Sequence, residues 1–383
     1  MPTNAIYLDY AAATPLDERV LAAMQPYLTT DFYNPSATYS GARQTRGTLE
    51  QARTQVAACL GARPSEIVFT AGGTEANNLA LHGVMRRFPE ATLLLSAVEH
   101  SAVLAPAAEY NYGLVQVSAD GRLDLDDLAN QLTDDVVLVS CMYANNEIGT
   151  IQPVRDIGRL LETIRKDRLR VGNKTPLYFH VDACQAANYL DIQVARLGAD
   201  LVSLNGSKIY GPKQTGVLYV KGGTQLTPLI SGGGQERGLR SGTENLAGIV
   251  GFATALQIAT EQRHDEGERL QELQKYWYKQ LALKVPTAVI NGSLAHRLPN
   301  NIHLTIPGID NERLLMQLDE AGIMAAAGSA CSASSQKPST VLAALGLDDA
   351  AARSSLRLTM GRGTTEAEID TTLDALQRFT SDH

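Results

Sequence analysis

The chain has 383 residues, of which 44% are hydrophobic and 19% are charged, and its net charge is -8. At roughly 150 residues per domain, this length predicts two domains. A negative chain without a basic block at either terminus argues against nucleic acid or an anionic membrane as a partner. No apolar run approaches the roughly 20 residues that span a bilayer, and no signal-peptide pattern is present, so we expect a cytoplasmic protein.

Short apolar runs before residue 222 predict buried strands. They lie at 66–70, 91–96, 135–142, 176–182, 200–205 and 216–221. Helical patterns occur between and around them, for example at 48–62 and 153–168. Strands that alternate with helices imply βαβ crossovers, and runs without polar alternation fit strands buried on both faces. We therefore expect an α/β fold with a mostly parallel sheet.

The pattern changes from about residue 255. A long amphipathic stretch follows, with large apolar side chains at helical spacing, which is typical of a core-facing helix. Shorter strand and helix patterns and a closing helix at 364–379 then predict a smaller α+β domain. We expect a large domain at 15–255 and a small domain made of 1–14 and 256–383, packed closely because no linker separates them.

The four cysteines are Cys59, Cys141, Cys184 and Cys331, and none forms a C-x-x-C pair. Neither a metal site nor a disulfide framework is expected from this spacing. Cys331 lies in GSACSASS, a run of small residues that cannot pack a core and that predicts a mobile loop before a helix. From the residues alone, a structural and a reactive role for this thiol both stay open.

Ligands of open α/β sheets bind beyond the carboxyl ends of the strands. The run 66–70 is followed by Gly72, Gly73 and Thr74 at the start of a predicted helix. Backbone N–H groups at such a helix N-terminus suit a phosphate, although glycines also serve ordinary strand-to-helix turns. No Gly-Lys-Ser/Thr follows, so the segment is not a P-loop.

Polar residues also follow later strands. Asp182 leaves a buried strand, where it needs a partner or caps a helix, and a pyridinium nitrogen would be such a partner. Lys208 stands just after the run 200–205, where apolar neighbours favour the neutral amine that a Schiff base requires. Lys213 follows a Gly-Pro turn and is expected to face outward or the backbone.

These clusters occur in a fixed order: GGTE, EH, NNEIG, HVDACQ, then GSK with GPK. From LDYAAATP at 8–15 to RLTMGRGTTEAEID at 357–370, the chain resembles the pyridoxal-phosphate enzymes of the class V aminotransferase family, and specifically the cysteine desulfurases. The resemblance covers almost the whole chain without large gaps. It implies a fold-type-I architecture with a seven-stranded, mostly parallel sheet in the large domain.

The resemblance also implies roles for residues around pyridoxal 5'-phosphate. Lys208 would hold the cofactor as an internal aldimine, Asp182 would face the pyridine nitrogen, and His100 would stack on the ring and relay protons. The remaining cofactor contacts would come from Gln185 at the phenolic oxygen and from Gly73 and Thr74 at the phosphate.

Ser207 stands where the family usually has a histidine, and Asn205 stands where serine is common. Both would lie near the cofactor. Serine can donate to a phosphate but is shorter and uncharged, so we expect an altered cofactor affinity rather than a different reaction.

The substrate, L-cysteine, would be bound by Asn34, Asn146 and Arg357, the last through a bidentate pair with the substrate carboxylate. Thr243 would reach the phosphate of the neighbouring subunit, which implies a homodimer. Cys331 would be the nucleophile: its thiolate would attack the sulfur of the cysteine–pyridoxal intermediate, releasing alanine and leaving a persulfide. Sulfur would then pass to a protein acceptor, such as a scaffold or a sulfur carrier.

Two alternatives stay open. Another pyridoxal-phosphate enzyme of the same fold, namely a selenocysteine lyase, a cystine lyase or an aminotransferase, would differ mainly in the loop that carries Cys331. A nucleotide-binding α/β protein, or a non-catalytic partner of a sulfur-transfer complex, is supported by the glycine turn alone.

Overall fold

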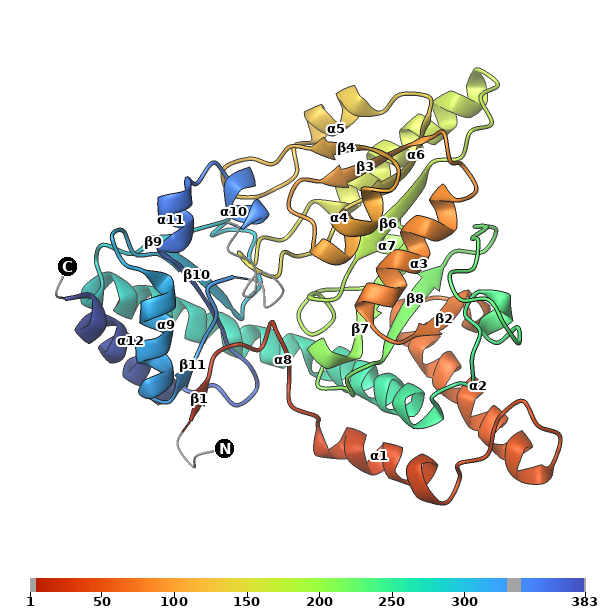
Figure 1. Cartoon of the computed structure of the whole chain (residues 1–383), viewed down its shortest axis with the longest axis horizontal. Coiled ribbons are helices and arrows are strands. Elements are labelled where there is room, and N and C mark those ends of the chain that lie inside the picture. The colour runs from red at the N-terminus through yellow and green to blue at the C-terminus, as the bar shows by residue number, and fades with distance from the viewer. Residues whose placement is uncertain (1–4, 329–338, 382–383) are drawn as a thin grey trace.

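The computed structural model describes residues 5–328 and 339–381, and in this part of the chain a seven-stranded central sheet lies beside two small sheets (Figure 1). Cys331 lies outside the described residues. Within the described ranges, no helix combines the length and the apolar character needed to cross a membrane.

The central sheet confirms the predicted α/β fold. Its strands, in spatial order, are β2 (Ile67–Thr70), β8 (Gly216–Val220), β7 (Leu201–Asn205), β6 (Tyr178–Asp182), β5 (Val136–Ser140), β3 (Thr92–Ser96) and β4 (Asn111–Val115). All neighbours are parallel except β8, which is antiparallel to both β2 and β7. The six predicted runs form six of these strands. The edge strand β4 was missed because it is short, mostly exposed and interrupted by Gly113.

Helices cover both faces of this sheet, as strands without polar alternation require. Leu93 and Leu95 of β3 pack on one face with α3 (Gly73–Met85) and α4 (Ser101–Ala107). Leu94 points to the other face, toward a core that includes α2 (Ser40–Leu60), α6 (Val154–Arg170) and α7 (Val194–Leu197). The remaining helices before residue 200 are α1 (Glu18–Thr29) and α5 (Leu125–Gln131). Alternate side chains of one strand thus hold two layers of helices.

Helix α8 (Leu246–Lys284) is 39 residues long and runs from the central sheet to the small sheets (Figure 1). Its first part, including Phe252 and Leu256, packs in the core of the central sheet. Its second part, including Leu270 and Trp277, packs in a separate core. The boundary expected at 255–256 falls inside this continuous helix, and the division into two domains stays a prediction.

The second core is built from short strands and helices. β12 (Ser355–Thr359), β10 (Asn301–Thr305) and β9 (Val289–Ile290) form an antiparallel sheet, and β1 (Ile6–Tyr7) pairs in parallel with β11 (Ile323–Met324). Helices α9 (Asn311–Glu320) and α12 (Glu366–Thr380) pack in this core, whereas α10 (Thr340–Ala344) and α11 (Asp349–Arg353) pack in a small separate cluster with Val98 and Ile148. Strand β1 therefore ties the N-terminal segment to the C-terminal part of the chain.

Candidate functional site

A cavity of about 200 Å³ lies at the carboxyl edge of the central sheet. Residues that follow β2, β3, β5, β6 and β7 line it, together with Ala11 and Ala12 from the N-terminal segment. The predicted site residues that line it are Gly73, Thr74, His100, Asn146, Asp182, Gln185, Asn205, Lys208 and Arg357. Parallel strands bring their carboxyl ends to one edge, which is why residues far apart in the sequence meet here.

The N-terminus of α3 forms one end of the cavity. Gly72, the residue before the helix, has a φ of +136°, a conformation that suits glycine. A Cβ atom at Gly73 would lie 2.6 Å from Sγ of Cys184, so only glycine fits at this position. Thr74 is exposed in the first helical turn. The uncapped N–H groups and the helix dipole make this end suitable for a phosphate.

The side chain of Asp182 is fixed at the end of β6. Its Oδ2 accepts a hydrogen bond from Nδ2 of Asn77 at 2.6 Å, and its Oδ1 accepts one from the backbone N–H of Cys184 at 2.9 Å. Asp182 is 7% exposed, so the carboxylate is nearly buried at the cavity wall. A buried anion of this kind calls for a cationic or hydrogen-bonding partner in the cavity.

Burial disfavours the charged forms of two further groups near this wall. Burial and the charge of Asp182 raise the pKa of Glu99 well above its usual range. Burial, followed by the charge of Asp182, likewise raises the pKa of the Cys184 thiol. Since a free thiol already titrates above neutral pH, the Cys184 thiol keeps its proton there.

His100 caps the N-terminus of α4. Its Nδ1 accepts a hydrogen bond from the backbone N–H of Ala102 at 3.0 Å. A neutral imidazole that accepts at Nδ1 carries its proton on Nε2, so Nε2 is the donor of this ring. The cap thus sets both the orientation and the tautomer of the histidine.

Lys208 ends the short 3₁₀ helix η2 (Gly206–Lys208), which directly follows β7. The side chain of Asn205 caps η2 by accepting from the backbone N–H of Ser207. Nζ of Lys208 donates to the carbonyl oxygen of Ala11 at 2.8 Å. Lys213 instead donates to the carbonyl oxygen of Thr14 at 3.2 Å and does not line the cavity. Lys208 is therefore the lysine that reaches the cavity.

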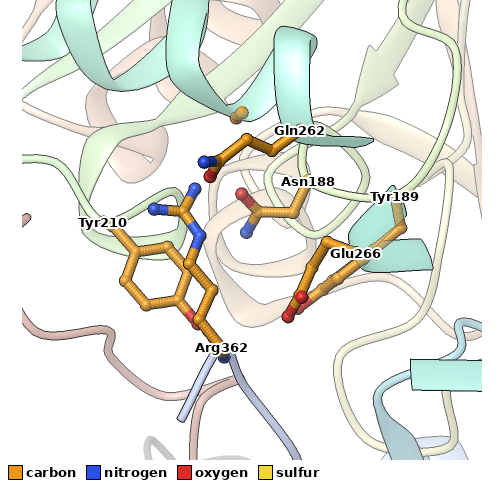
Figure 2. Close-up of a pocket in the computed structure, with 7 residues that line it drawn as sticks. Asn188, Tyr189, Tyr210, Gln262, Glu266 and Arg362 are labelled. Atoms are coloured by element: carbon orange, nitrogen blue, oxygen red, sulfur yellow. The ribbon is translucent and has the colours of Figure 1, made fainter. Parts of the chain in front are cut away.

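A second, much smaller pocket lies beside η2 (Figure 2). Its volume of about 10 Å³ is near the minimum for a single water molecule, so the pocket is a small gap between packed side chains rather than a ligand site. The guanidinium of Arg362 lies 4.0 Å from the ring centroid of Tyr210. Asn188 in the same pocket donates to the carbonyl oxygen of Lys208 at 2.6 Å.

Tyr210 has a φ of +61°, a strained conformation for a residue other than glycine. Several contacts hold it there. Its hydroxyl accepts from the backbone N–H of Arg362 at 2.8 Å, and its own N–H donates to Oγ1 of Thr14 at 2.8 Å. The chain on both sides of Lys208 is thus fixed by contacts with remote segments.

Arg357 enters the cavity from β12. It is 1% exposed, donates to Asp9 Oδ1 at 2.7 Å, and donates to the carbonyl oxygen of Asn146 at 3.0 Å. Its Nε is buried and has no hydrogen-bond partner among the described residues. An unused donor on a buried guanidinium at a cavity wall suits a carboxylate ligand.

The structure does not bring every predicted residue to this cavity. Asn34 is exposed and its Oδ1 accepts from the backbone N–H of Ser36. Thr243 is exposed in the loop before α8, and Ser207 donates its hydroxyl proton to Asn205. None of these three lines the cavity, and Cys331 lies outside the described residues.

The cavity also contains residues that the sequence did not single out. Asn77 is the clearest case, because it is 1% exposed and bonded to Asp182. Its signal in the sequence is a polar residue on the buried face of α3, three positions after Thr74, where spacing places the two side chains on one side of the helix. Met142 and Ala144 line the cavity after β5, and isolated apolar residues of this kind carry no sequence signal.

Known proteins resemble this chain over almost its whole length. A model of the family "Aminotransferase class-V" matches residues 6–372. A cysteine desulfurase IscS of Dictyoglomus turgidum is 40% identical over 383 residues, which cover 98% of this chain and 94% of that protein. A cysteine desulfurase IscS 1 of Archaeoglobus fulgidus is 39% identical and covers 97% and 95%, respectively.

Solved structures are similar over nearly the same length. A NifS-like protein superposes with a TM-score of 0.90 at 32% identity, covering 99% of this chain and 100% of that one. A structure of SspA in complex with cysteine gives a TM-score of 0.80 at 33% identity and covers 93% and 98%. The family match and the relatives both span far more than half of the chain. The chain therefore belongs to the class-V aminotransferase family.

Proposed function

We propose that this protein is a pyridoxal-phosphate-dependent cysteine desulfurase that converts L-cysteine to L-alanine and transfers the sulfur to Cys331 as a persulfide. The observation that carries the proposal is the single cavity in which Lys208, Asp182, His100 and Arg357 meet. Relatives named cysteine desulfurase, at about 40% identity over almost the full length, support the same reaction.

The residues of the cavity fit pyridoxal phosphate. The N-terminus of α3 with Gly73 and Thr74 suits the phosphate, and Asp182 suits a pyridinium nitrogen. Lys208 would bind the aldehyde, Gln185 would reach the phenolic oxygen, and His100 would cover the ring. Asn205 lines the same wall. Ser207 does not line it and would influence the cofactor through its hydrogen bond to Asn205. The bound cofactor would supply an electron sink for bonds at the substrate's α and β carbons.

The protein's own groups then perform the remaining tasks. Arg357 and Asn146 bind and orient the substrate, the guanidinium through its Nε donor, which has no partner among the described residues. Lys208 and His100 hold and move protons at the substrate carbons, and the proton of the neutral His100 ring lies on Nε2 because Nδ1 accepts from Ala102. The buried wall around Asp182 excludes water from the reacting atoms.

The sulfur transfer balances without an added oxidant. The C–S bond of L-cysteine breaks, an S–S bond to Cys331 forms, and the Cys331 thiol and the substrate become a persulfide and L-alanine. The described residues on either side of the segment 329–338 lie near the cavity. Ala326 pairs with Arg357 through two backbone hydrogen bonds, and Ser339 donates to Glu147 at 2.6 Å, next to Asn146.

We further propose a cytoplasmic homodimer that passes sulfur to a scaffold or sulfur-carrier protein. Thr243 and Asn34 are exposed and do not line the cavity of their own chain, which supports a role at the site of a neighbouring subunit. Exposed apolar side chains on and beside α1, namely Leu21, Leu28 and Phe32, favour the same assembly. We expect light scattering of the purified protein to give a molar mass of twice the chain mass of 41.1 kDa.

The cofactor assignment is tested by colour and by peptide mapping. We expect the purified protein to absorb visible light, to lose this absorption on borohydride reduction, and to carry the reduced cofactor on the peptide that contains Lys208. A colourless, folded protein that pyridoxal phosphate does not reconstitute would instead favour the nucleotide-binding or non-catalytic alternative.

The reaction is tested at Cys331. The variant Cys331→Ala should bind cofactor and cysteine but lose sulfur transfer, by about 10³-fold or more, because the attacking thiolate is removed. Cys59→Ala, a change of a half-buried thiol on α2, is the matched control and should retain activity. Mass spectrometry of the wild-type protein after incubation with cysteine should locate the persulfide on Cys331. Unchanged turnover by Cys331→Ala would favour a lyase of the same fold.

A further inference from the structure

Asn77 is a buried polar residue at the cavity wall that the proposed reaction does not yet use. It lies on the second turn of α3, is 1% exposed, and lines the cavity. Burial of an amide in this way is unfavourable unless its groups are hydrogen-bonded. Its presence on an otherwise apolar helix face therefore calls for a specific role.

The two ends of the Asn77 amide differ in their contacts. Its Nδ2 donates to Oδ2 of Asp182 at 2.6 Å, a short distance that is typical of a hydrogen bond to a charged acceptor. Its Oδ1 is buried and has no partner among the described residues. The donor end is thus bonded to Asp182, and both residues line the same cavity.

The other contacts of Asp182 complete this arrangement. The backbone N–H of Cys184 donates to Oδ1 at 2.9 Å, so each carboxylate oxygen has a donor and the plane of the group is fixed. The titratable groups around Asp182 are Glu99, His180, Cys184 and Lys208. Burial raises the pKa values of Glu99 and the Cys184 thiol and lowers the pKa of His180 to about 4, so burial disfavours the charged form of each of these three groups.

From this geometry we infer that Asn77 is a positioning residue, which holds the carboxylate of Asp182 in place toward a cationic N–H donor in the cavity. The inference rests on the proposed function, in which that donor is the pyridinium nitrogen of the cofactor. A carboxylate that loses a hydrogen-bond donor becomes more basic. Without Asn77 the proton shared with the ring nitrogen therefore moves toward Asp182.

The test uses the cofactor-loaded enzyme with ¹⁵N in the pyridine ring. In the wild-type protein the ¹⁵N chemical shift should report a protonated nitrogen from pH 6 to 9. In Asn77→Leu the shift should move toward that of neutral pyridine, with an apparent pKa lower by about one pH unit, the expected scale for one hydrogen bond to a charged group. We expect kcat to fall about tenfold, with KM for cysteine within about threefold, as for other partners that orient a reacting group.

Asn78→Leu is the matched control. Asn78 is the adjacent residue on α3, and its amide donates to Thr74 and Ala102 carbonyl oxygens instead of Asp182. Its variant should leave the ¹⁵N shift unchanged. Asn77→Ala, with a smaller side chain and high helix propensity, provides the same measurement if the leucine does not fit.

The outcomes separate the two proposals. A wild-type protein that carries no cofactor on Lys208 would contradict the proposed function itself. A wild-type protein that loads normally, with Asn77 variants whose ¹⁵N shift and kcat match the wild type, would overturn the role of Asn77 alone.

Discussion

The two sides of the cavity are built in different ways. On the sheet side, the groups come from successive strand ends between β2 and β7, and local contacts fix them, such as the bond from the Cys184 backbone to Asp182. On the opposite side, Arg357 comes from β12 and is held by Asp9 and Asn146, which lie 348 and 211 positions away in the chain.

The difference shows which part of a site follows from topology. A parallel sheet with its helices necessarily gathers its strand ends at one edge, so the sheet side exists once the large core is formed. The Arg357 side exists only if the second core, helix α8 and the N-terminal segment pack against that edge. We therefore expect changes on the sheet side to affect cofactor chemistry, and changes on the Arg357 side to affect substrate binding.

The largest effect is expected on the sheet side. Lys208→Ala should abolish covalent cofactor binding and lower kcat/KM by about 10³-fold or more, because both the covalent anchor and a proton carrier are lost. Lys213→Ala is the control, since Lys213 bonds only to a loop carbonyl in the described structure. The amount of cofactor that stays attached to the denatured protein after borohydride reduction measures the first effect. Equal loss in both variants would contradict the assignment of Lys208.

On the Arg357 side of the cavity we expect a smaller effect, which changes substrate binding. Arg357→Lys keeps the charge opposite Asp9 but loses the planar fork that binds a carboxylate through two bonds. KM for cysteine should rise about 10- to 100-fold, the range for a hydrogen bond to a charged group, while cofactor absorption stays unchanged.

Arg353→Lys, an exposed change on α11, is the control for this experiment and should have wild-type KM. If Arg357→Lys lost the cofactor and retained its KM, the division of the cavity into a cofactor side and a substrate side would be wrong.

The smallest effect concerns stability. It involves two buried histidines, one in the central sheet and one in the second core. His180 bonds to Ser140 and Ser203 across three strands of the central sheet, and burial lowers its pKa from 6.5 to about 4. His303 lies on β10 opposite Arg357, and burial followed by the charges of Arg297 and Arg357 lowers its pKa to about 3.

Both histidines are neutral when folded, so the unfolded chain binds more protons below pH 6.5. Each neutral histidine contributes fully to the free energy of unfolding above pH 6.5. As the pH falls below 6.5, this contribution decreases by about 1.4 kcal/mol per pH unit for each residue, until the pH reaches the pKa of the folded state. Denaturant titrations between pH 7 and 4.5 should show a shallower pH dependence in His180→Asn than in the wild type. His264→Asn, at a residue whose side chain is 81% exposed, should retain the wild-type slope.

Much of the fold could be predicted because it depends on local patterns. The apolar runs gave six of the seven central strands, and the order of the polar motifs after them gave the resemblance to a family. The missed strand has a physical cause, because β4 is an exposed edge without an apolar run. The domain boundary expected at 255–256 falls inside helix α8 and stays a prediction.

For this protein, the sequence by itself determined the buried strands, the glycine turn before α3 and the position of Lys208 directly after a strand, since each depends on neighbours along the chain. Only the tertiary structure decided that Asn77 bonds to Asp182, that Nε of Arg357 has no partner among the described residues, and that Ser207, Asn34 and Thr243 do not line the cavity. These contacts join residues from separate segments, and the distance between their atoms is set by how the two cores pack rather than by any local pattern.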